Sequence, residues 1–294
     1  MSAATAEKGL EKAIVRIGNI EIGGEKPVII AGPCAVESRE QIIEIAQLVK
    51  EAGADMLRGG AYKPRSNPYS FQGLREKGLA YLAKARELVG LPIVTEITCV
   101  RKLEFVARYA NMLQVGTRNM QNYDLLTAIG EETDIPILLK RGLTATLDEF
   151  LNSAEYIAKE RKERGVEPNI VLCLRGVRIS HNRQRCKSDY HELPELRKMT
   201  DYPVIFDPSH AVGNGRSKNE SELIREQVVN AAKAALRAGV DGLIVEVYPD
   251  AVNKAQCDAH QQLSIPEFRE IVEYAIAPAS QREKYLSNKS EPLW

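Results

Sequence analysis

The sequence predicts an α/β fold in which eight parallel strands, each followed by a helix, close into a (β/α)8 barrel. Short aliphatic runs recur along the 294 residues, and amphipathic stretches separate them. The glycine-rich phosphate loop that a doubly wound sheet carries after its first strand is missing, because the corresponding segment reads GPCAVES. One α/β barrel occupies about 200–400 residues, so the chain has the length of a single TIM barrel.

The predicted strands are aliphatic and mostly continuous, which is typical of parallel strands that are covered on both faces. They span Val28–Cys34, Asp55–Gly60, Pro92–Thr98, Met112–Thr117, Ile135–Gly142, Asn169–Gly176, Pro203–His210 and Gly242–Tyr248. Helical patterns such as SREQIIEIAQLVKEAG lie between them, and several begin near Ser, Thr or Asp and end in Gly.

The segments that flank the predicted barrel are short. Val15–Ile17 and Ile20–Ile22 flank Gly18-Asn19 and predict a β-hairpin, which we expect to cap the barrel floor. We therefore divide the chain into an N-terminal extension at 1–27, a barrel domain at 28–277 and a polar tail at 278–294. Both flanks are shorter than the roughly 50 residues of an independent domain, so we expect no separate regulatory domain.

The composition narrows the class of protein. Forty Lys and Arg residues balance forty Asp and Glu residues, which argues against a general binder of nucleic acid or anionic membranes. The N-terminus has no apolar signal core, and no apolar run approaches the roughly 18 residues of a membrane span. Five cysteines, an odd number without a C-x-x-C pair, suit reduced thiols. We expect a cytoplasmic enzyme.

Catalytic groups of a TIM barrel come from the C-terminal ends of its strands, and every predicted strand ends in polar or reactive residues. The larger group of these residues consists of lysines and arginines. A polyanionic ligand would balance their charge, because guanidinium groups bind phosphate and carboxylate oxygens through paired hydrogen bonds. The cations are Arg58, Lys63, Arg65, Arg118, Lys140 and Arg175.

A second group combines one thiol, one imidazole and two carboxylates: Cys34, His210, Glu246 and Asp258. Mixed sulfur, nitrogen and oxygen donors suit Zn²⁺, Fe²⁺, Mn²⁺ or Co²⁺ better than Mg²⁺ or Ca²⁺. A rival metal site stays open beside Asp258, because Cys257 and His260 have C-x-x-H spacing. We expect the mid-strand Cys173 to be part of the core.

Several motifs together resemble a known family. GPCAVES, LRGGAYKPRSNPYSFQG, GTRNMQN, LLKRG, LRGVR, DPSH and IVEVYPD resemble the 3-deoxy-D-arabino-heptulosonate 7-phosphate (DAHP) synthases, in particular the short type I-beta branch. The resemblance implies a metal-dependent TIM barrel that joins phosphoenolpyruvate to erythrose 4-phosphate at the entry of the shikimate pathway. The loops at 179–193 and 211–220, and Leu174, depart from the usual type I-beta pattern.

The resemblance also implies roles for residues of this chain. It places the metal ligands at Cys34, His210, Glu246 and Asp258. It assigns the phosphate of phosphoenolpyruvate to Arg118 and Arg175, and its carboxylate region to Arg58, Lys63 and Lys140. Arg65 and Ser66 would meet the erythrose phosphate, and Glu96 would lie near the phosphate and its waters. The set of catalytic candidates is Cys34, Lys63 and His210, and the last two compete with metal-bound water as proton donor.

Three alternative functions are weighed against this one. A 3-deoxy-D-manno-octulosonate 8-phosphate synthase uses arabinose 5-phosphate, but that family has Lys-Ala-Asn-Arg where this chain has Lys63 to Ser66. A Schiff-base aldolase would use Lys140 and would leave the Cys/His/Glu/Asp set without a role. A silent sugar-phosphate-binding barrel would have lost a ligand or a cation. We also expect a homodimer or homotetramer, and a rate that aromatic amino acids leave nearly unchanged.

Overall fold

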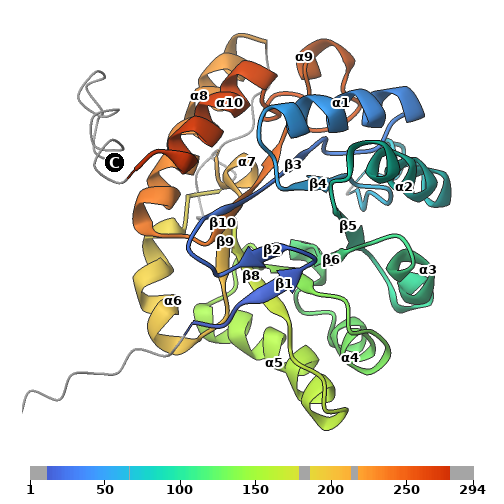
Figure 1. Cartoon of the computed structure of the whole chain (residues 1–294), viewed down its shortest axis with the longest axis vertical. Coiled ribbons are helices and arrows are strands. Elements are labelled where there is room, and N and C mark those ends of the chain that lie inside the picture. The colour runs from blue at the N-terminus through green and yellow to red at the C-terminus, as the bar shows by residue number, and fades with distance from the viewer. Residues whose placement is uncertain (1–11, 66, 179–185, 213–217, 279–294) are drawn as a thin grey trace, which may run out of the picture.

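The computed structural model describes residues 12–65, 67–178, 186–212 and 218–278. Within these residues, eight parallel strands close into a barrel in the order β3 to β10, with β10 pairing to β3. Helices surround the strands (Figure 1). The barrel strands are β3 (Val28–Gly32), β4 (Met56–Arg58), β5 (Ile93–Ile97), β6 (Met112–Val115), β7 (Ile137–Lys140), β8 (Ile170–Leu174), β9 (Val204–Phe206) and β10 (Gly242–Glu246). The predicted fold class and all eight predicted strands are confirmed.

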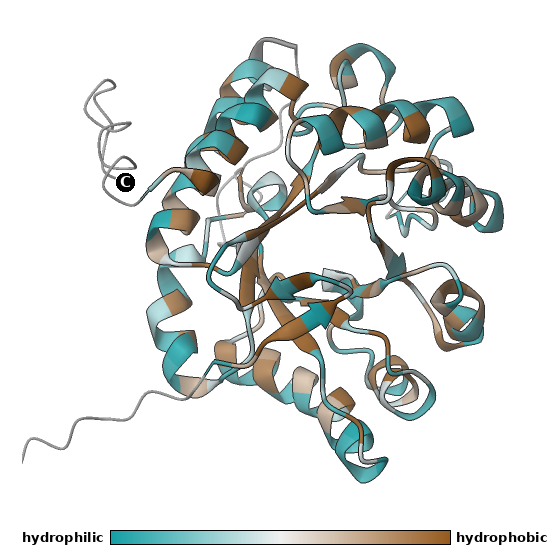
Figure 2. Cartoon of the chain, viewed as in Figure 1, coloured by the Kyte–Doolittle hydropathy of each residue, from teal (hydrophilic) through white to brown (hydrophobic). Residues whose placement is uncertain are grey.

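The helices cover the barrel because each presents an apolar stripe to the strands. In α1 (Arg39–Glu51), for example, Ile42, Ile45 and Val49 are buried at helical spacing. In Figure 2 most of the barrel strands are brown, whereas the helices alternate teal and brown along their length. The other helices are α2 (Glu76–Val89), α3 (Leu103–Ala107), α4 (Tyr123–Glu132), α5 (Leu147–Glu163), α6 (Leu193–Met199), α7 (Pro208–Ala211), α8 (Lys218–Ala238), α9 (Ala251–Lys254) and α10 (Ile265–Ile276), with 3₁₀ turns η1 (Val100–Lys102), η2 (Thr117–Asn119) and η3 (Tyr190–Glu192).

The predicted hairpin is present. Its strands β1 (Val15–Ile17) and β2 (Ile20–Ile22) pair antiparallel, and Gly18 adopts a left-handed φ of 61° in the turn. Val15, Ile17 and Ile22 belong to the same apolar cluster as inward-facing residues of the barrel strands. In Figure 1 the hairpin lies across the centre of the barrel. It therefore closes the interior at the end where the strands begin.

The seventh predicted strand extended too far. It was expected to reach His210, but β9 ends at Phe206, and Pro208–Ala211 forms the short helix α7. The side chain of Asp207 caps this helix by accepting a hydrogen bond from the backbone N–H of His210, and Pro208 occupies the first turn. The aliphatic run is thus followed by a helix start, which places His210 on a helix instead of a strand.

Some sequence predictions fall outside the described residues. These are Ser66, parts of the loops at 179–193 and 211–220, the beginning of the N-terminal extension, and the polar tail at 278–294 apart from its first residue. The division into extension, barrel and tail stays a prediction. None of the helices in the described part of the chain combines the length and the apolar character needed to cross a membrane.

Candidate active site at the carboxyl ends of the strands

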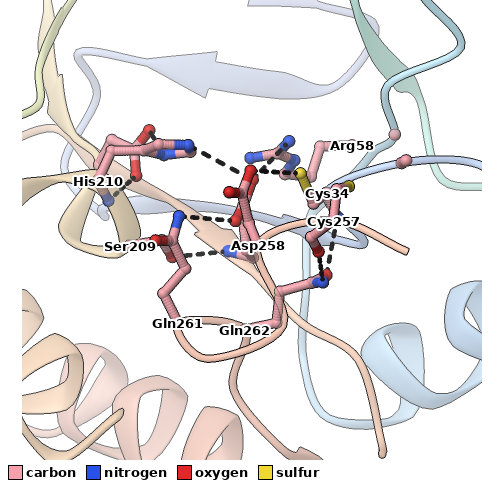
Figure 3. A network of polar contacts seen from close by, with 12 residues as sticks. Cys34, Arg58, Ser209, His210, Cys257, Asp258, Gln261 and Gln262 are labelled. Carbon is pink, nitrogen blue, oxygen red and sulfur yellow. Dashed lines mark hydrogen bonds and ion pairs between the residues drawn. The ribbon is translucent and has the colours of Figure 1, made fainter. Parts of the chain in front are cut away.

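The four residues predicted as metal ligands come together at the barrel mouth, the face formed by the carboxyl ends of the strands. Cys34 follows β3, His210 lies on α7, Glu246 ends β10 and Asp258 follows α9. Two groups of ligand-type atoms share Asp258: Cys34 with Cys257 and Asp258, and His210 with Glu246 and Asp258. Within each group these atoms lie within 4.8 Å of one another. Figure 3 shows the cluster with its surrounding polar contacts.

His210 is held in a fixed orientation by Asp207. Its Nδ1 lies 2.8 Å from Asp207 Oδ2, and its backbone N–H donates to Asp207 Oδ1 at 3.1 Å. The other ring nitrogen, Nε2, lies 3.6 Å from Glu246 Oε1. A carboxylate that holds one nitrogen of an imidazole fixes its tautomer and leaves the other nitrogen for a ligand. Asp207 thus directs Nε2 of His210 toward the cluster.

Glu246 is completely buried and is held from three sides. Its backbone N–H donates to Ser209 Oγ, its Oε2 accepts from Gln261, and its Oε1 lies 3.2 Å from Arg58 Nη2. Burial alone would raise the pKa of Glu246, but the charges of His210 and Arg58 lower it below its ordinary value. The group is therefore a carboxylate, with Oε1 making no hydrogen bond among the described residues.

Asp258 joins the two halves of the cluster. Its Oδ2 accepts a hydrogen bond from the Cys34 thiol at 3.1 Å. Burial would raise its pKa, yet the positive charges of His210 and Lys63 lower the pKa of Asp258 to about 2. The residue has a left-handed φ of 48°, which is uncommon outside glycine and is typical of constrained functional positions.

The predicted cations differ in how they are paired. Lys140 is buried and forms an ion pair with Asp207, while Arg175 donates to the backbone oxygen of His210 at 3.3 Å. Arg118 is exposed on η2, and Lys63 and Arg65 are half-buried. Burial by itself would lower the pKa of Lys63. Its electrostatic interactions with Cys34, Cys257 and Glu246 are larger in sum and raise that pKa above its ordinary value.

The barrel mouth contains buried arginine donors without acceptors. Nε and Nη1 of Arg58 and Nε of Arg175 are buried and have no hydrogen-bond partner among the described residues. Leaving such charged donors unpaired is costly unless a ligand supplies acceptors. Oxygen-rich anions such as phosphates and carboxylates supply them in the geometry that guanidinium groups prefer.

Glu96 ends β5 and is half-buried beside Gly116. A Cβ atom at position 116 would lie 2.0 Å from Glu96 Oε1, so any larger residue there would force the Glu96 carboxylate to move. Arg141, which also follows β7, does not join the cations: it forms ion pairs with Asp189 and Glu192 and donates to the backbone oxygen of Ala145.

The structure excludes the rival Cys257/His260 pair as part of one metal group. His260 Nδ1 lies 2.6 Å from Ser221 Oγ, and among the described residues His260 belongs to neither group of ligand-type atoms. Cys257 instead lies with Cys34 and Asp258. Cys173 is buried inside the barrel, as expected.

Sequence reasoning left three residues of this site without a role: Asp207, Gln261 and Gln262. Asp207 lies near the end of a predicted strand, and its i, i+3 spacing to His210 is the signal that the sequence offers. A pocket of about 290 Å³ opens beside the cluster and is lined by residues that include Arg65, Gln256, Cys257, Asp258 and His260. Of the ligand-type residues, Cys257 and Asp258 line this pocket.

Comparison with known proteins decides the family. The model of the DAHP synthetase I family matches residues 4–280. The chain belongs to this family. It is 42% identical to the phospho-2-dehydro-3-deoxyheptonate aldolase of Thermotoga maritima, over 90% of this chain and 73% of that protein. It is 32% identical to a 2-dehydro-3-deoxyphosphooctonate aldolase of Fusobacterium nucleatum, over 89% of this chain and 94% of that protein.

Solved structures of the DAHP synthetase I family agree with the fold. The crystal structure of the T. maritima DAHP synthase superposes with a TM-score of 0.81 at 41% identity, covering 95% of this chain and 74% of that one. A truncated form of the T. maritima enzyme gives 0.78 at 39% identity and covers 95% of this chain and 93% of that one. The family resemblance that the motifs indicate is therefore confirmed.

Proposed function

We propose that this chain is a DAHP synthase: it condenses phosphoenolpyruvate with erythrose 4-phosphate and water to give DAHP and phosphate, the first step of the shikimate pathway. The observation that carries the proposal is the pairing of two features in one barrel mouth. Buried arginine donors without acceptors lie directly beside a Cys/His/Glu/Asp cluster. This combination suits a phosphorylated carboxylic acid that reacts next to a divalent cation.

The cations divide between the two substrates. Arg118 and Arg175 hold the phosphate of phosphoenolpyruvate, and Arg58, Lys63 and Lys140 surround its carboxylate. Arg65 lines the pocket beside Asp258, which supports its role, with Ser66, at the phosphate of the aldose. Glu96 is placed near the phosphate and its waters. The ring neutralises a trianionic substrate and orients it for attack.

The residues of the cluster fit a divalent metal ion. Cys34, His210, Glu246 and Asp258 offer the mixed donors that Mn²⁺, Co²⁺, Fe²⁺ or Zn²⁺ accept. Glu246 Oε1 is buried, makes no hydrogen bond among the described residues and has only the Arg58 ion pair and the nearby His210 ring, so it has acceptor capacity left for a metal ion. When bound, the ion supplies Lewis acidity toward the aldehyde oxygen.

The reaction makes a carbon–carbon bond between C3 of phosphoenolpyruvate and the aldehyde carbon. Water then forms a carbon–oxygen bond at C2 and releases one proton, the C2–O bond to phosphate breaks, and the C2 hydroxyl gives its proton to the departing phosphate to leave the ketone. The arginines compensate the charge of the phosphate throughout, and the developing hydroxyl takes one proton. Lys63, which lies beside the cluster, and His210, which belongs to it, are the side chains that we propose as donors of that proton.

The second candidate is 3-deoxy-D-manno-octulosonate 8-phosphate synthase. It is favoured by the match to the F. nucleatum aldolase along almost the whole length of that protein. The two candidates share the phosphoenolpyruvate side of the site and differ in the aldose. Lys63-Pro64-Arg65-Ser66, at the aldose end, matches the DAHP synthase motif.

Phosphate release from phosphoenolpyruvate tests the function directly. We expect a kcat/KM with erythrose 4-phosphate at least about tenfold above that with arabinose 5-phosphate, a difference of about 1.4 kcal/mol in transition-state stabilisation. The opposite ranking assigns the chain to the octulosonate enzymes. No release with either aldose overturns both candidates.

Removal of metal tests the proposed cofactor. A chelator should abolish the condensation, Mn²⁺ or Co²⁺ should restore it, and Cys34→Ala should not recover at moderate metal concentration. Full activity of the metal-free chain would contradict the metal role.

We also propose that the protein is a cytoplasmic homodimer or homotetramer. Light scattering after size exclusion measures the assembly, and cell fractionation tests the compartment.

A further inference from the structure

His260 lies on a loop whose neighbouring polar residues are fixed at the cluster. Asp258 accepts a hydrogen bond from the Cys34 thiol, and Gln261 donates to Glu246 at 3.2 Å. Figure 3 shows Asp258 and Gln261 on this loop, both turned toward the cluster. His260 lies between them in the chain, yet among the described residues it belongs to neither group of ligand-type atoms. Its neighbours thus fix its backbone, and its imidazole is available for another role.

The imidazole of His260 is oriented by a serine of helix α8. Its Nδ1 lies 2.6 Å from Oγ of Ser221, which is buried in the first turn of that helix. The hydrogen bond at one ring nitrogen decides the role of the other. When the Ser221 hydroxyl donates to Nδ1, Nε2 carries the proton and is a donor. The serine therefore leaves Nε2 as the nitrogen that can meet a ligand.

His260 shares a pocket with Arg65, the cation that we propose for the phosphate of the aldose. Both residues line the pocket of about 290 Å³, and Asp258 lines it too. Because Asp258 also belongs to the cluster, this pocket directly adjoins the place where the aldehyde would react. The phosphate of an aldose lies at the other end of a short carbon chain, and a phosphate dianion accepts hydrogen bonds from several donors at once.

We propose that His260 is a second contact to the phosphate of the aldose and acts together with Arg65. Nε2 of His260 donates to one phosphate oxygen, and the guanidinium group of Arg65 donates to others. Ser221 is a positioning residue, since it holds the imidazole without touching the substrate. This role rests on the proposed function, because it requires an aldose phosphate as substrate, and it applies to erythrose 4-phosphate and arabinose 5-phosphate alike.

Steady-state rates of His260→Ala, measured with the activating metal ion present, test this role. Loss of a hydrogen bond to a charged group should raise the KM of the aldose phosphate about tenfold or more, while kcat and the KM of phosphoenolpyruvate change less than about twofold. His260→Gln keeps a donor at the end of its side chain and should recover part of the loss. His191→Ala removes an exposed imidazole on η3 and is the matched control, which should equal the wild type.

Unphosphorylated erythrose separates a phosphate contact from a purely structural role. Because this aldose has no phosphate, His260→Ala should leave its kcat/KM within about twofold of the wild-type value. Ser221→Ala should raise the KM of the aldose phosphate, but less than His260→Ala does. Equal losses with erythrose and erythrose 4-phosphate overturn the role, as does an equal rise in the KM of both substrates. If the wild type does not turn over erythrose, the comparison of the two KM values decides.

If His260→Ala does not fold, a crystal structure of the wild-type chain with bound erythrose 4-phosphate decides. A phosphate oxygen within about 3.2 Å of Nε2 supports the contact, and any other position of the phosphate refutes it. Absence of phosphate release with either aldose phosphate refutes the proposed function itself. A chain that condenses an aldose phosphate with the same KM in wild type and His260→Ala refutes this proposal alone.

Discussion

Asp207 joins the proposed metal side of the site to the proposed substrate side. One of its oxygens, Oδ2, contacts both His210 Nδ1 and the ammonium group of Lys140. Burial would raise the pKa of Asp207, but the charges of His210 and Lys140 hold it well below its ordinary value. The group is thus a permanent carboxylate that serves two donors at once.

Replacing this carboxylate by an amide should therefore disturb both sides. Asp207→Asn replaces the carboxylate by a neutral amide, which cannot offer both donors a negatively charged oxygen. His210 therefore loses its fixed tautomer. We expect metal affinity to fall about 10–100-fold and kcat/KM to fall with it. Equilibrium metal titration and steady-state rates measure the two effects. Asp134→Asn, which alters an exposed partner of Arg164, is the control and should change neither.

Lys140 decides between metal-assisted condensation and an imine mechanism. An imine requires a neutral amine, whereas the Lys140 ammonium group is paired with the buried Asp207. We therefore expect borohydride, added with phosphoenolpyruvate or with product, to trap no adduct. Peptide mass spectrometry of residue 140 is the measurement, and a stable adduct there would replace the proposed mechanism.

At the scale of elements, the hairpin β1–β2 acts as part of the barrel interior. Ile22 is fully buried and packs in the cluster that fills the barrel. Ile22→Ala leaves a cavity that the surrounding strands cannot fill, and we expect the free energy of unfolding to fall by about 2–5 kcal/mol. Denaturant titration measures it. Glu21→Ala on the exposed face of the same strand should change it by less than about 0.5 kcal/mol, and equal effects would show that the hairpin is not packed as described.

At the scale of the whole molecule, the charged site links stability to pH. The pKa of Asp258 is about 2 in the folded chain and close to 4 when unfolded. A lowered folded pKa stabilises the chain above pH 4, and this stabilisation is lost as the pH falls from about 4 to about 2. Glu246 and Asp207 are shifted in the same direction.

The metal-free chain should therefore lose more stability in acid than an Asp258→Asn variant does. We expect the difference to amount to about 2 kcal/mol between pH 5 and pH 2. Asparagine tolerates the left-handed backbone at this position, so the substitution tests the charge. Urea unfolding at several pH values measures the slopes; parallel slopes for the two chains would show that Asp258 is not shifted.

The sequence by itself determined the barrel, its strands, the hairpin and the residue types at the mouth. Buried parallel strands and amphipathic helices have local patterns, and the C-terminal ends of barrel strands converge on one face. Cys34, His210 and Glu246 could therefore be grouped from the ends of predicted strands, whereas Asp258 lies ten residues beyond the last of them, after α9. Local signals also explain why the seventh predicted strand was drawn as far as His210, since Asp207-Pro208 is a helix start that follows directly on the aliphatic run.

Tertiary structure decided which side chains pair. In the folded chain Cys257 lies beside Cys34, and His260 contacts Ser221. Arg141 forms ion pairs with Asp189 and Glu192, and Asp207 contacts two donors. The thiol of Cys34 and its acceptor Asp258 are 224 positions apart. Such pairings depend on loop paths and on which way each side chain points after the strands close, and no local pattern encodes either.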